Sequence, residues 1–357
     1  MVEISAKTPK QRVNDRFYAL DGLRLFAALL VSGFHYCFVA ERDGFIAVTI
    51  FPEVTRYMYL GVSLFFILSG FVIPYSSNNK SIKSFVILRV VRLYPAFLFC
   101  MPITFIGAYL LFSDPRFSVT LRDAILNITM IPGFFSARMI DGVYWTLLVE
   151  IKFYILIGIF LIVKKWVRFE WFLFAWMSVY LINQYVLSLP LSKFIAFPES
   201  PLFMIGTLLY MMIAEGVIFY RVIALALALA LAYGYESGRA TANVMNFGTS
   251  FEMKYIFSVI VFFVLLVWTS AKIPVAKWVQ KLGDLTYPFY LLHDYLGLIL
   301  ISFLASILSP INSIIFILLL MLVIAYCVNR YVELPVQNFL KKFLSKNTGL
   351  SVCAART

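Results

Sequence analysis

The chain has 357 residues, of which 62% are hydrophobic and 13% charged, and its formal net charge is +12. Soluble domains are about 45–50% apolar and about 25% charged, so this composition, with a mean hydropathy of +0.90, excludes an ordinary soluble protein. The apolar stretches are continuous rather than alternating, which excludes a membrane β-barrel, and no polar region carries the basic, aromatic-rich stripe typical of nucleic-acid binding.

Ten stretches of about 20 apolar residues recur along the chain, the length that a helix needs to cross a bilayer. They lie near residues 17–38, 56–75, 89–112, 143–163, 168–189, 194–214, 217–234, 253–270, 285–308 and 311–332. The fifth contains the polar Asn183 and Gln184, and the sixth contains the proline-broken segment 197–201. The expected fold class is an all-α, polytopic integral membrane helix bundle.

The basic residues predict how this bundle is oriented. If the N-terminus is inside, 20 of the 30 lysines and arginines lie on the inner side and 8 on the outer side, while Arg24 and Lys152 lie within spans. Cytoplasmic loops retain basic residues, so both termini are predicted to be cytoplasmic. The expected parts are an N-terminal segment 1–16, a transmembrane domain 17–334 and a C-terminal tail 335–357. The first span reads as an anchor without a cleavage site.

The two histidines, His35 and His293, both lie in predicted spans, where an ionisable residue is a hypothesis about function. Eleven residues at about 100° each place Arg24 and His35 on one helical face, about 16 Å apart along the axis. Asp21 is three residues before Arg24, a spacing that predicts an ion pair. The alternatives are that Arg24 is a snorkelling interface residue and that His35 is a hydrogen-bonded core histidine.

Arg89 and Arg92 begin the third span on its cytoplasmic side and, three residues apart, share one helical face. Two guanidinium groups there are suited to bidentate phosphate binding, and Lys80 and Lys83 lie just upstream. The alternative is simple positive-inside flanking of a span.

The fourth span carries Thr146, Glu150 and Tyr154 at successive i+4 positions, which predicts a polar face on an apolar helix. Lys152 points about 200° away from Glu150, so the two are not expected to pair. For both charged residues, an ion pair with another helix is the alternative.

The last two spans carry the remaining polar candidates. His293 and Asp294 follow Pro288 in the ninth span, where a helix–helix hydrogen bond is at least as good an interpretation as catalysis. Glu333 ends the tenth span, and the simplest interpretation is an interfacial residue beside Arg330, with the helix stopped by Pro335. The four cysteines lack metal-ligand spacing, so no metal site is expected.

Several segments together resemble acyltransferase family 3, integral membrane enzymes that transfer acyl groups, often acetyl, to surface sugars. They are LDGLR at 20–24 with an R-x10-H pattern completed by His35, FFILSGFVI at 65–73, RVVRLYP at 89–95, YWTLLVEIKFY at 144–154, LTYPFYLLH at 285–293 and VELP at 332–335. Thr146 and Thr286 stand where serine is common, and Ile151 and Lys152 replace a more usual acidic and amide pair.

The resemblance implies roles for matching residues. It suggests His35 as the catalytic base, Arg24 as its companion, Arg89 and Arg92 as binders of acyl-CoA phosphates, and Glu150 and Glu333 as functional carboxylates. Further candidates are Asp21, Ser69, Tyr144, Trp145, Lys152 and His293. The expected enzyme is a stand-alone O-acyltransferase, without a C-terminal extracytoplasmic hydrolase-like domain, in a bacterial inner membrane.

Acyl-CoA, most simply acetyl-CoA, is the expected donor, and a cell-surface or exported glycan, which can be lipid-linked, is the expected acceptor. A polytopic transporter or lipid-linked glycan flippase is the competing interpretation, because intramembrane charges and a proline-broken span suit transport as well. A non-catalytic scaffold is a third, but it gives no reason for placing Arg24 and His35 on one stripe.

Overall fold

The computed structural model describes residues 17–47, 50–78, 80–111, 117–195, 197–247 and 250–348. Within these ranges all regular elements are helices, so the predicted all-α class is confirmed. The longer helices are α2 (Tyr18–Phe34), α5 (Gly61–Ser77), α6 (Ile82–Leu111), α8 (Trp145–Val163), α9 (Phe169–Ile182), α10 (Ser200–Glu215), α11 (Phe219–Phe247), α12 (Met253–Ser270), α13 (Val279–Leu292), α14 (Tyr295–Leu304), α15 (Pro310–Val328) and α16 (Leu334–Thr348). The short and non-α turns are η1 (His35–Val39), α3 (Ala40–Arg42), α4 (Pro52–Thr55), η2 (Met58–Leu60), α7 (Leu121–Asn127), η4 (Pro132–Phe135), η5 (Gly142–Tyr144), η6 (Asn183–Leu187), η7 (Pro190–Lys193) and η8 (Asn329–Glu333).

Seven helical runs among the described residues are long and apolar enough to cross a membrane. The number rises to eight if α13 and α14, which are bent by 74° at their junction, form one span. The predicted fifth and sixth spans correspond to α9, with 14 residues, and α10, with 16, which are short for a bilayer. The chain is therefore a multi-pass membrane protein, while the count of ten crossings stays a prediction.

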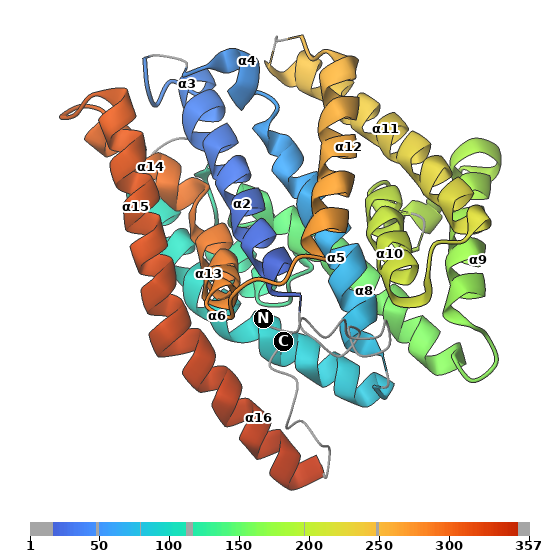
Figure 1. Ribbon diagram of the computed structural model, residues 1–357. Helices are drawn as coiled ribbons and strands as arrows, with labels where there is room; N and C mark the ends of the chain where they lie inside the picture. The colour runs from blue at the N-terminus through green and yellow to red at the C-terminus, as the bar shows by residue number, and fades with distance from the viewer. Residues whose placement is uncertain are drawn as a thin grey trace, which may run out of the picture.

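The centre of the bundle is formed by α2, α5, α10 and α13 (Figure 1). The closest contact joins α5 to α10, because a Cβ atom at Gly206 would lie 1.9 Å from the carbonyl oxygen of Ile67, and one at Gly70 would lie 2.2 Å from that of Phe203. Small residues let transmembrane helices approach in this way, and Thr207 adds a 3.0 Å hydrogen bond to the Gly70 carbonyl.

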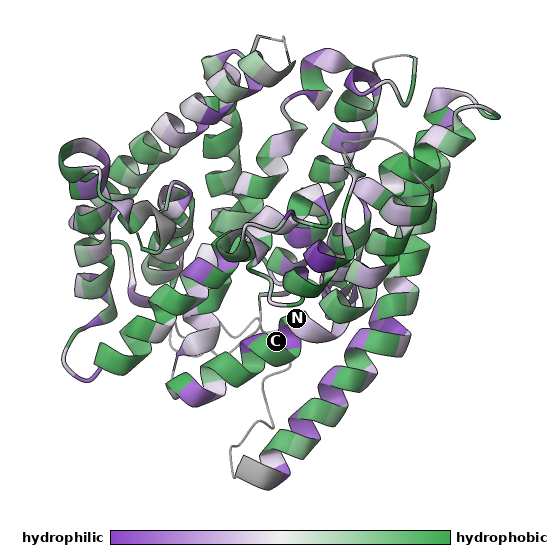
Figure 2. Cartoon of the chain, turned by 180° about the vertical axis from the view of Figure 1, so that it is seen from behind, coloured by the Kyte–Doolittle hydropathy of each residue, from purple (hydrophilic) through white to green (hydrophobic). Residues whose placement is uncertain are grey.

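The outer helices expose apolar faces suited to lipid. Only 28% of the apolar window in α12 and 33% of that in the run from α15 to α16 is buried within the protein. Figure 2 shows that the long helices are hydrophobic over most of their length. Large exposed side chains such as Phe262, Leu265, Leu319 and Val323 would be costly in water, so they fit the hydrocarbon core.

Two π-helical turns coincide with predicted site residues. The turn η1 begins at His35, and η8 ends at Glu333. Single π turns are rare in α-helices overall. Those that do occur are often found at functional sites. The expectation that Pro335 stops the last span is wrong, because α15, η8 and α16 form one helical run from Pro310 to Lys346. The widened turn before the proline accommodates its ring and its missing N–H.

The ninth predicted span is broken rather than continuous. His293 and Asp294 lie between α13 and α14, where the ψ angle of Asp294 is −88° and helical geometry ends. The break brings α14 close to η1, since a Cβ atom at Gly297 would lie 2.2 Å from the Tyr36 hydroxyl oxygen. Both histidine-bearing segments therefore depart from regular α-helix at their histidine.

Candidate active site

The end of the bundle that the basic residues predict to be outer brings the two histidines into contact. The Nδ1 atom of His35 lies 3.2 Å from the Nε2 atom of His293, and the two rings stack with centroids 5.2 Å apart. His293 has no exposed surface, whereas the His35 side chain keeps 14% exposed. A helix–helix hydrogen bond at His293 is one of the two interpretations of the sequence, but the sequence does not identify its partner, 258 positions away.

The hydrogen-bond partners fix the tautomers of the neutral pair. His293 Nδ1 lies 2.9 Å from the carbonyl oxygen of Tyr290, which can only accept, so this nitrogen carries the hydrogen. His293 Nε2 is then an acceptor, and His35 Nδ1 donates to it. No donor among the described residues reaches His35 Nε2, so its lone pair is free, which is the condition that a general base or nucleophile must meet.

A carboxylate and a hydroxyl hold the histidine pair in place. Asp294 Oδ1 lies 3.5 Å from His35 Nδ1, and the Tyr36 hydroxyl donates a 2.7 Å hydrogen bond to the His293 carbonyl. Asp141, fully buried at the start of η5, accepts hydrogen bonds from the backbone N–H groups of Val143 and Tyr295. Sequence reasoning assigned no role to Asp141, whose only local signal is an acidic residue directly before a helix start.

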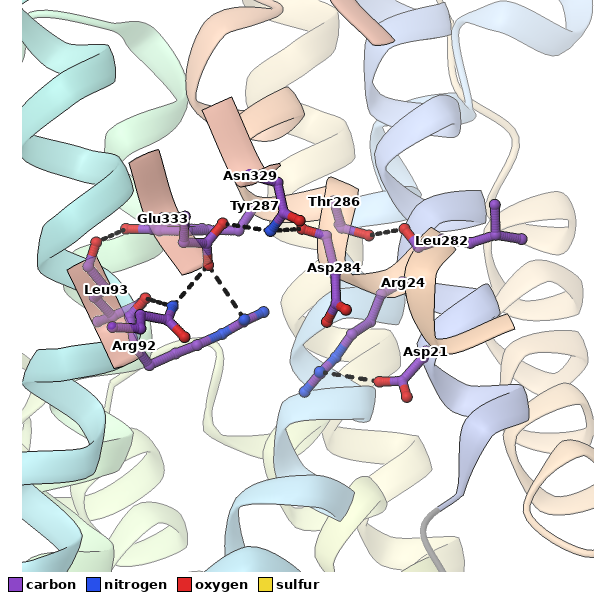
Figure 3. Close-up of polar contacts among 11 residues, drawn as sticks. Asp21, Arg24, Arg92, Leu93, Leu282, Asp284, Thr286, Tyr287, Asn329 and Glu333 are labelled. Atoms are coloured by element: carbon purple, nitrogen blue, oxygen red, sulfur yellow. Dashed lines mark hydrogen bonds and ion pairs between the residues drawn. The ribbon is translucent and has the colours of Figure 1, made fainter. Parts of the chain in front are cut away.

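The end of the bundle that is predicted to be inner contains a second polar group, drawn in Figure 3. The predicted pair is present there, with Arg24 Nη1 3.6 Å from Asp21 Oδ1. Arg92 Nη1 lies 3.3 Å from Glu333 Oε1, and Arg92 is near enough to Arg24 for the two positive charges to act on each other. Two guanidinium groups thus approach one another from α2 and α6.

Glu333 is a buried member of this group, so the interpretation that it lies beside Arg330 is wrong: the cation that it contacts is Arg92. Its carboxylate has no exposed surface and accepts hydrogen bonds from Asn329 at 3.0 Å and from Gln337 at 2.9 Å. Because the π turn η8 rotates the carboxylate toward α6, it contacts Arg92, whereas Arg330 is exposed. Buried carboxylates with this many partners are strongly held in place.

Arg89 and Arg92 lie on the same helix but contact different residues. The Arg89 guanidinium donates to the Ser76 hydroxyl and lies 5.2 Å and 5.4 Å from the ring centroids of Phe85 and Tyr154. The buried Nε atom of Arg89 has no hydrogen-bond partner among the described residues. Burial and the charges of Arg89 and Lys341 lower the pKa of Lys80, just before α6, to about 8. Phosphate binding by Arg89 and Arg92 stays a prediction.

The polar face predicted for the fourth span is present on α8. Glu150 Oε1 accepts a 2.8 Å hydrogen bond from Tyr154 and a 3.4 Å contact from Ser69. Lys152 points elsewhere, as expected, with its Nζ atom 5.8 Å from the Phe197 ring centroid.

The start of α8 reaches the histidine pair. Thr146 shares a 2.9 Å hydrogen bond with the hydroxyl of Tyr290, and the Tyr144 hydroxyl donates to the Leu291 carbonyl at 3.2 Å. Trp145 lies between these two residues in the sequence and faces Arg239, with the guanidinium carbon 5.8 Å from its ring. The motif residues at 144–146 therefore join the outer site to α11.

Sequence reasoning missed Glu236 and Arg239, because the seventh span was expected to end near residue 234. The helix α11 instead continues to Phe247, and the two side chains pair within it at 3.2 Å. Hydropathy alone predicts that a span ends at its first charged residues. A glutamate and an arginine that pair with each other can nevertheless lie within a helix that packs against protein.

The family model described as "Acyltransferase domain" matches residues 17–330, a range that includes both polar groups except Glu333 and Gln337. The peptidoglycan O-acetyltransferase OatA of Listeria monocytogenes serovar 1/2a (strain ATCC BAA-679 / EGD-e) is 29% identical over 171 residues. That match covers 42% of this chain and 25% of the relative. No solved structure matches.

Proposed function

The chain belongs to the acyltransferase family whose model it matches over residues 17–330, and we propose that it moves an acyl group, most simply acetyl, from acyl-CoA to a hydroxyl of a cell-surface glycan. The observation that carries this proposal is the His35–His293 contact, which leaves His35 Nε2 able to accept a proton inside the membrane domain. The peptidoglycan O-acetyltransferase that the chain resembles over part of its length supports a sugar hydroxyl as acceptor.

In the proposed reaction, His35 Nε2 removes the proton of the sugar hydroxyl as the hydroxyl oxygen attacks the thioester carbonyl carbon. The C–S bond then breaks, and the CoA thiolate takes the proton back from the imidazolium. His293 and Asp294 act on His35 Nδ1 and are positioning residues, since a fixed tautomer keeps Nε2 unprotonated. Asp294 also stabilises the positive charge that His35 acquires.

The donor is proposed to enter at the inner end, where Lys80, Arg89, Arg92 and Arg24 supply positive charge. Arg89 is the best phosphate contact among them, because its Nε atom has no hydrogen-bond partner in the described part of the chain. Arg24 and His35 are separated by about 16 Å along the helix, a distance that the extended pantetheine arm of CoA can span. Arg24 is thereby placed to orient the arm or its thioester.

The proposal is tested by transfer in proteoliposomes that contain only this protein. We expect label from acetyl-CoA to appear on oligosaccharides released from the surface polysaccharides of a deletion strain of the native host. Mass spectrometry then identifies the acylated hydroxyl. If no carbohydrate fraction takes up label while the protein is intact and folded, the proposed function is wrong.

The same proteoliposomes distinguish two mechanisms at His35, in which it acts either as a general base or as a nucleophile. If Nε2 attacks the thioester itself, an acyl-histidine forms and is then resolved by the acceptor. Incubation with labelled acetyl-CoA and no acceptor leaves label on the protein in that case only. General-base catalysis leaves the protein unlabelled.

Replacing Arg89 with glutamine is expected to raise the Michaelis constant for acyl-CoA by roughly 10- to 100-fold, the effect of losing one charge-assisted contact. Neutralising Lys342, an exposed cation on the same inner side, is the matched control and should leave that constant unchanged. Initial rates at varied acyl-CoA and saturating acceptor measure both variants. An unchanged constant in Arg89→Gln would assign Arg89 to packing against Phe85 and Tyr154 alone.

A further inference from the structure

A third polar cluster lies on α11 and on neighbouring elements at the outer side, and we call it the Arg239 cluster. At its centre, Arg239 Nη1 lies 3.2 Å from both carboxylate oxygens of Glu236, one helical turn earlier. Glu236 has no exposed surface and also accepts a hydrogen bond from the Ser63 hydroxyl of α5. Because lipid would penalise these charges, α11 must direct them into the protein.

Aromatic rings surround the guanidinium of Arg239. Its central carbon lies 4.8 Å from the ring centroid of Tyr59, 5.7 Å from that of Tyr235 and 5.8 Å from that of Trp145. The Arg239 side chain is 22% exposed, and Trp145 is only partly buried. The cluster therefore combines aromatic rings with charged hydrogen-bonding groups and stays accessible at its centre.

Three buried polar atoms near this centre lack hydrogen-bond partners among the described residues. They are the hydroxyl oxygen of Tyr59, the Oε2 atom of Glu199 and the Oγ atom of Ser200. Tyr59 is 3% exposed and Ser200 is fully buried. Glu199 joins the cluster through a 3.4 Å contact with the Tyr235 hydroxyl, and its charge acts on Arg239. More than nine in ten buried polar groups are satisfied in native proteins, so these atoms point to a ligand with hydroxyl groups.

The cluster adjoins the histidine pair on two sides. Trp145 precedes Thr146, which contacts Tyr290, and the Tyr290 ring centroid lies 5.3 Å from that of His293. On the other side, the Tyr59 ring centroid lies 5.8 Å from that of Phe34, and the Phe34 ring centroid lies 5.5 Å from that of His35. A ligand held at Arg239 is thus within two side chains of the proposed base.

We propose that the Arg239 cluster is the subsite that binds a pyranose ring of the acyl acceptor, an inference that rests on the function proposed above. A pyranose ring presents an apolar C–H face that suits the Trp145 ring and equatorial hydroxyls that suit carboxylate and guanidinium groups. Glu236 balances the charge of Arg239, and Lys152 is near enough to Glu199 for their charges to act on each other, so the cluster is close to neutral and the ring bound here is uncharged.

The test uses two variants of the full-length protein. Trp145→Leu removes the aromatic ring, and the double variant Glu236→Gln with Arg239→Gln removes both charges together, so that neither is left unpaired. Each should raise the Michaelis constant for the oligosaccharide acceptor about tenfold or more, with that for acyl-CoA unchanged. Trp145→Phe, which keeps an aromatic face, should restore most of the affinity. Trp171→Leu, an exposed tryptophan on α9, is the matched control and should have no effect.

Calorimetric binding of the same oligosaccharides, without acyl-CoA, separates this inference from the function on which it rests. Weaker binding by the cluster variants but not by Trp171→Leu supports the subsite. If the wild type transfers acyl groups and the cluster variants bind and react like it, the subsite is wrong and the acyltransferase stands. If the wild type binds the oligosaccharides more tightly than the cluster variants do but transfers nothing to them, the sugar subsite stands and the proposed function is wrong.

Discussion

Replacing His35 with alanine is expected to lower the rate of acyl transfer by about 10²- to 10⁴-fold, the usual contribution of a general base. The loss should appear in kcat, because no contact to the bound phosphates of the donor is removed. His35→Gln is the matched control for folding, since its amide can still donate to His293 Nε2 but offers no basic nitrogen. Steady-state rates in proteoliposomes, at equal protein content, measure both variants.

Equal loss in His35→Ala and His35→Gln assigns the effect to proton transfer, and a rate near wild type in either would remove His35 from the chemistry. His293→Ala adds a separate readout for a positioning residue. It should lower kcat less than the loss of His35 does and should shift the pH dependence of kcat, because the tautomer of His35 is no longer fixed.

Replacing Glu333 with alanine is expected to destabilise the folded protein by about 3–5 kcal/mol, because it removes the carboxylate that pairs directly with Arg92 inside the bundle. Asn329 and Gln337 each lose one of their two acceptors in the same step. Thermal unfolding in detergent micelles and the yield of monodisperse protein measure the effect.

Glu333→Gln combined with Arg92→Gln is the control for this prediction. Both charges disappear together, so stability should recover toward wild type even though the ion pair is lost. If Glu333→Ala alone unfolds at the wild-type temperature, the pair contributes no net stability. The contact between α6 and the run from α15 to α16 would then depend on packing and on the 3.4 Å hydrogen bond from the Gln337 amide to the Arg92 carbonyl.

Local patterns in the sequence were sufficient to predict what lies on one helix. The Asp21–Arg24 pair and the contact between Glu150 and Tyr154 follow from i+3 and i+4 spacing, and both are present. The orientation of Lys152 away from Glu150 follows from the same geometry. Periodicity of this kind places side chains on a face but does not say which helix that face meets.

Contacts between distant segments were beyond this reasoning. The approach of His293 to His35 depends on a helix break and on a π turn, and neither has a reliable local signal. The Arg92–Glu333 pair likewise needs a helix that continues through Pro335, where steric rules alone predict an end. Irregular backbone inside a bundle is stabilised by tertiary contacts, so a single sequence does not reveal it.

The length of the continuous helical run from Pro310 to Lys346 indicates how deep its residues lie in the membrane. Its 37 residues are about 55 Å long at 1.5 Å each, whereas the hydrocarbon core is about 30 Å thick. Glu333 lies about 35 Å from Pro310, so with Pro310 at the predicted outer surface the Arg92–Glu333 pair is expected near the boundary between inner headgroups and acyl chains. The nucleotide of the proposed donor, held at that level, would stay in contact with water, and only the slender thioester arm would have to enter the low-dielectric interior.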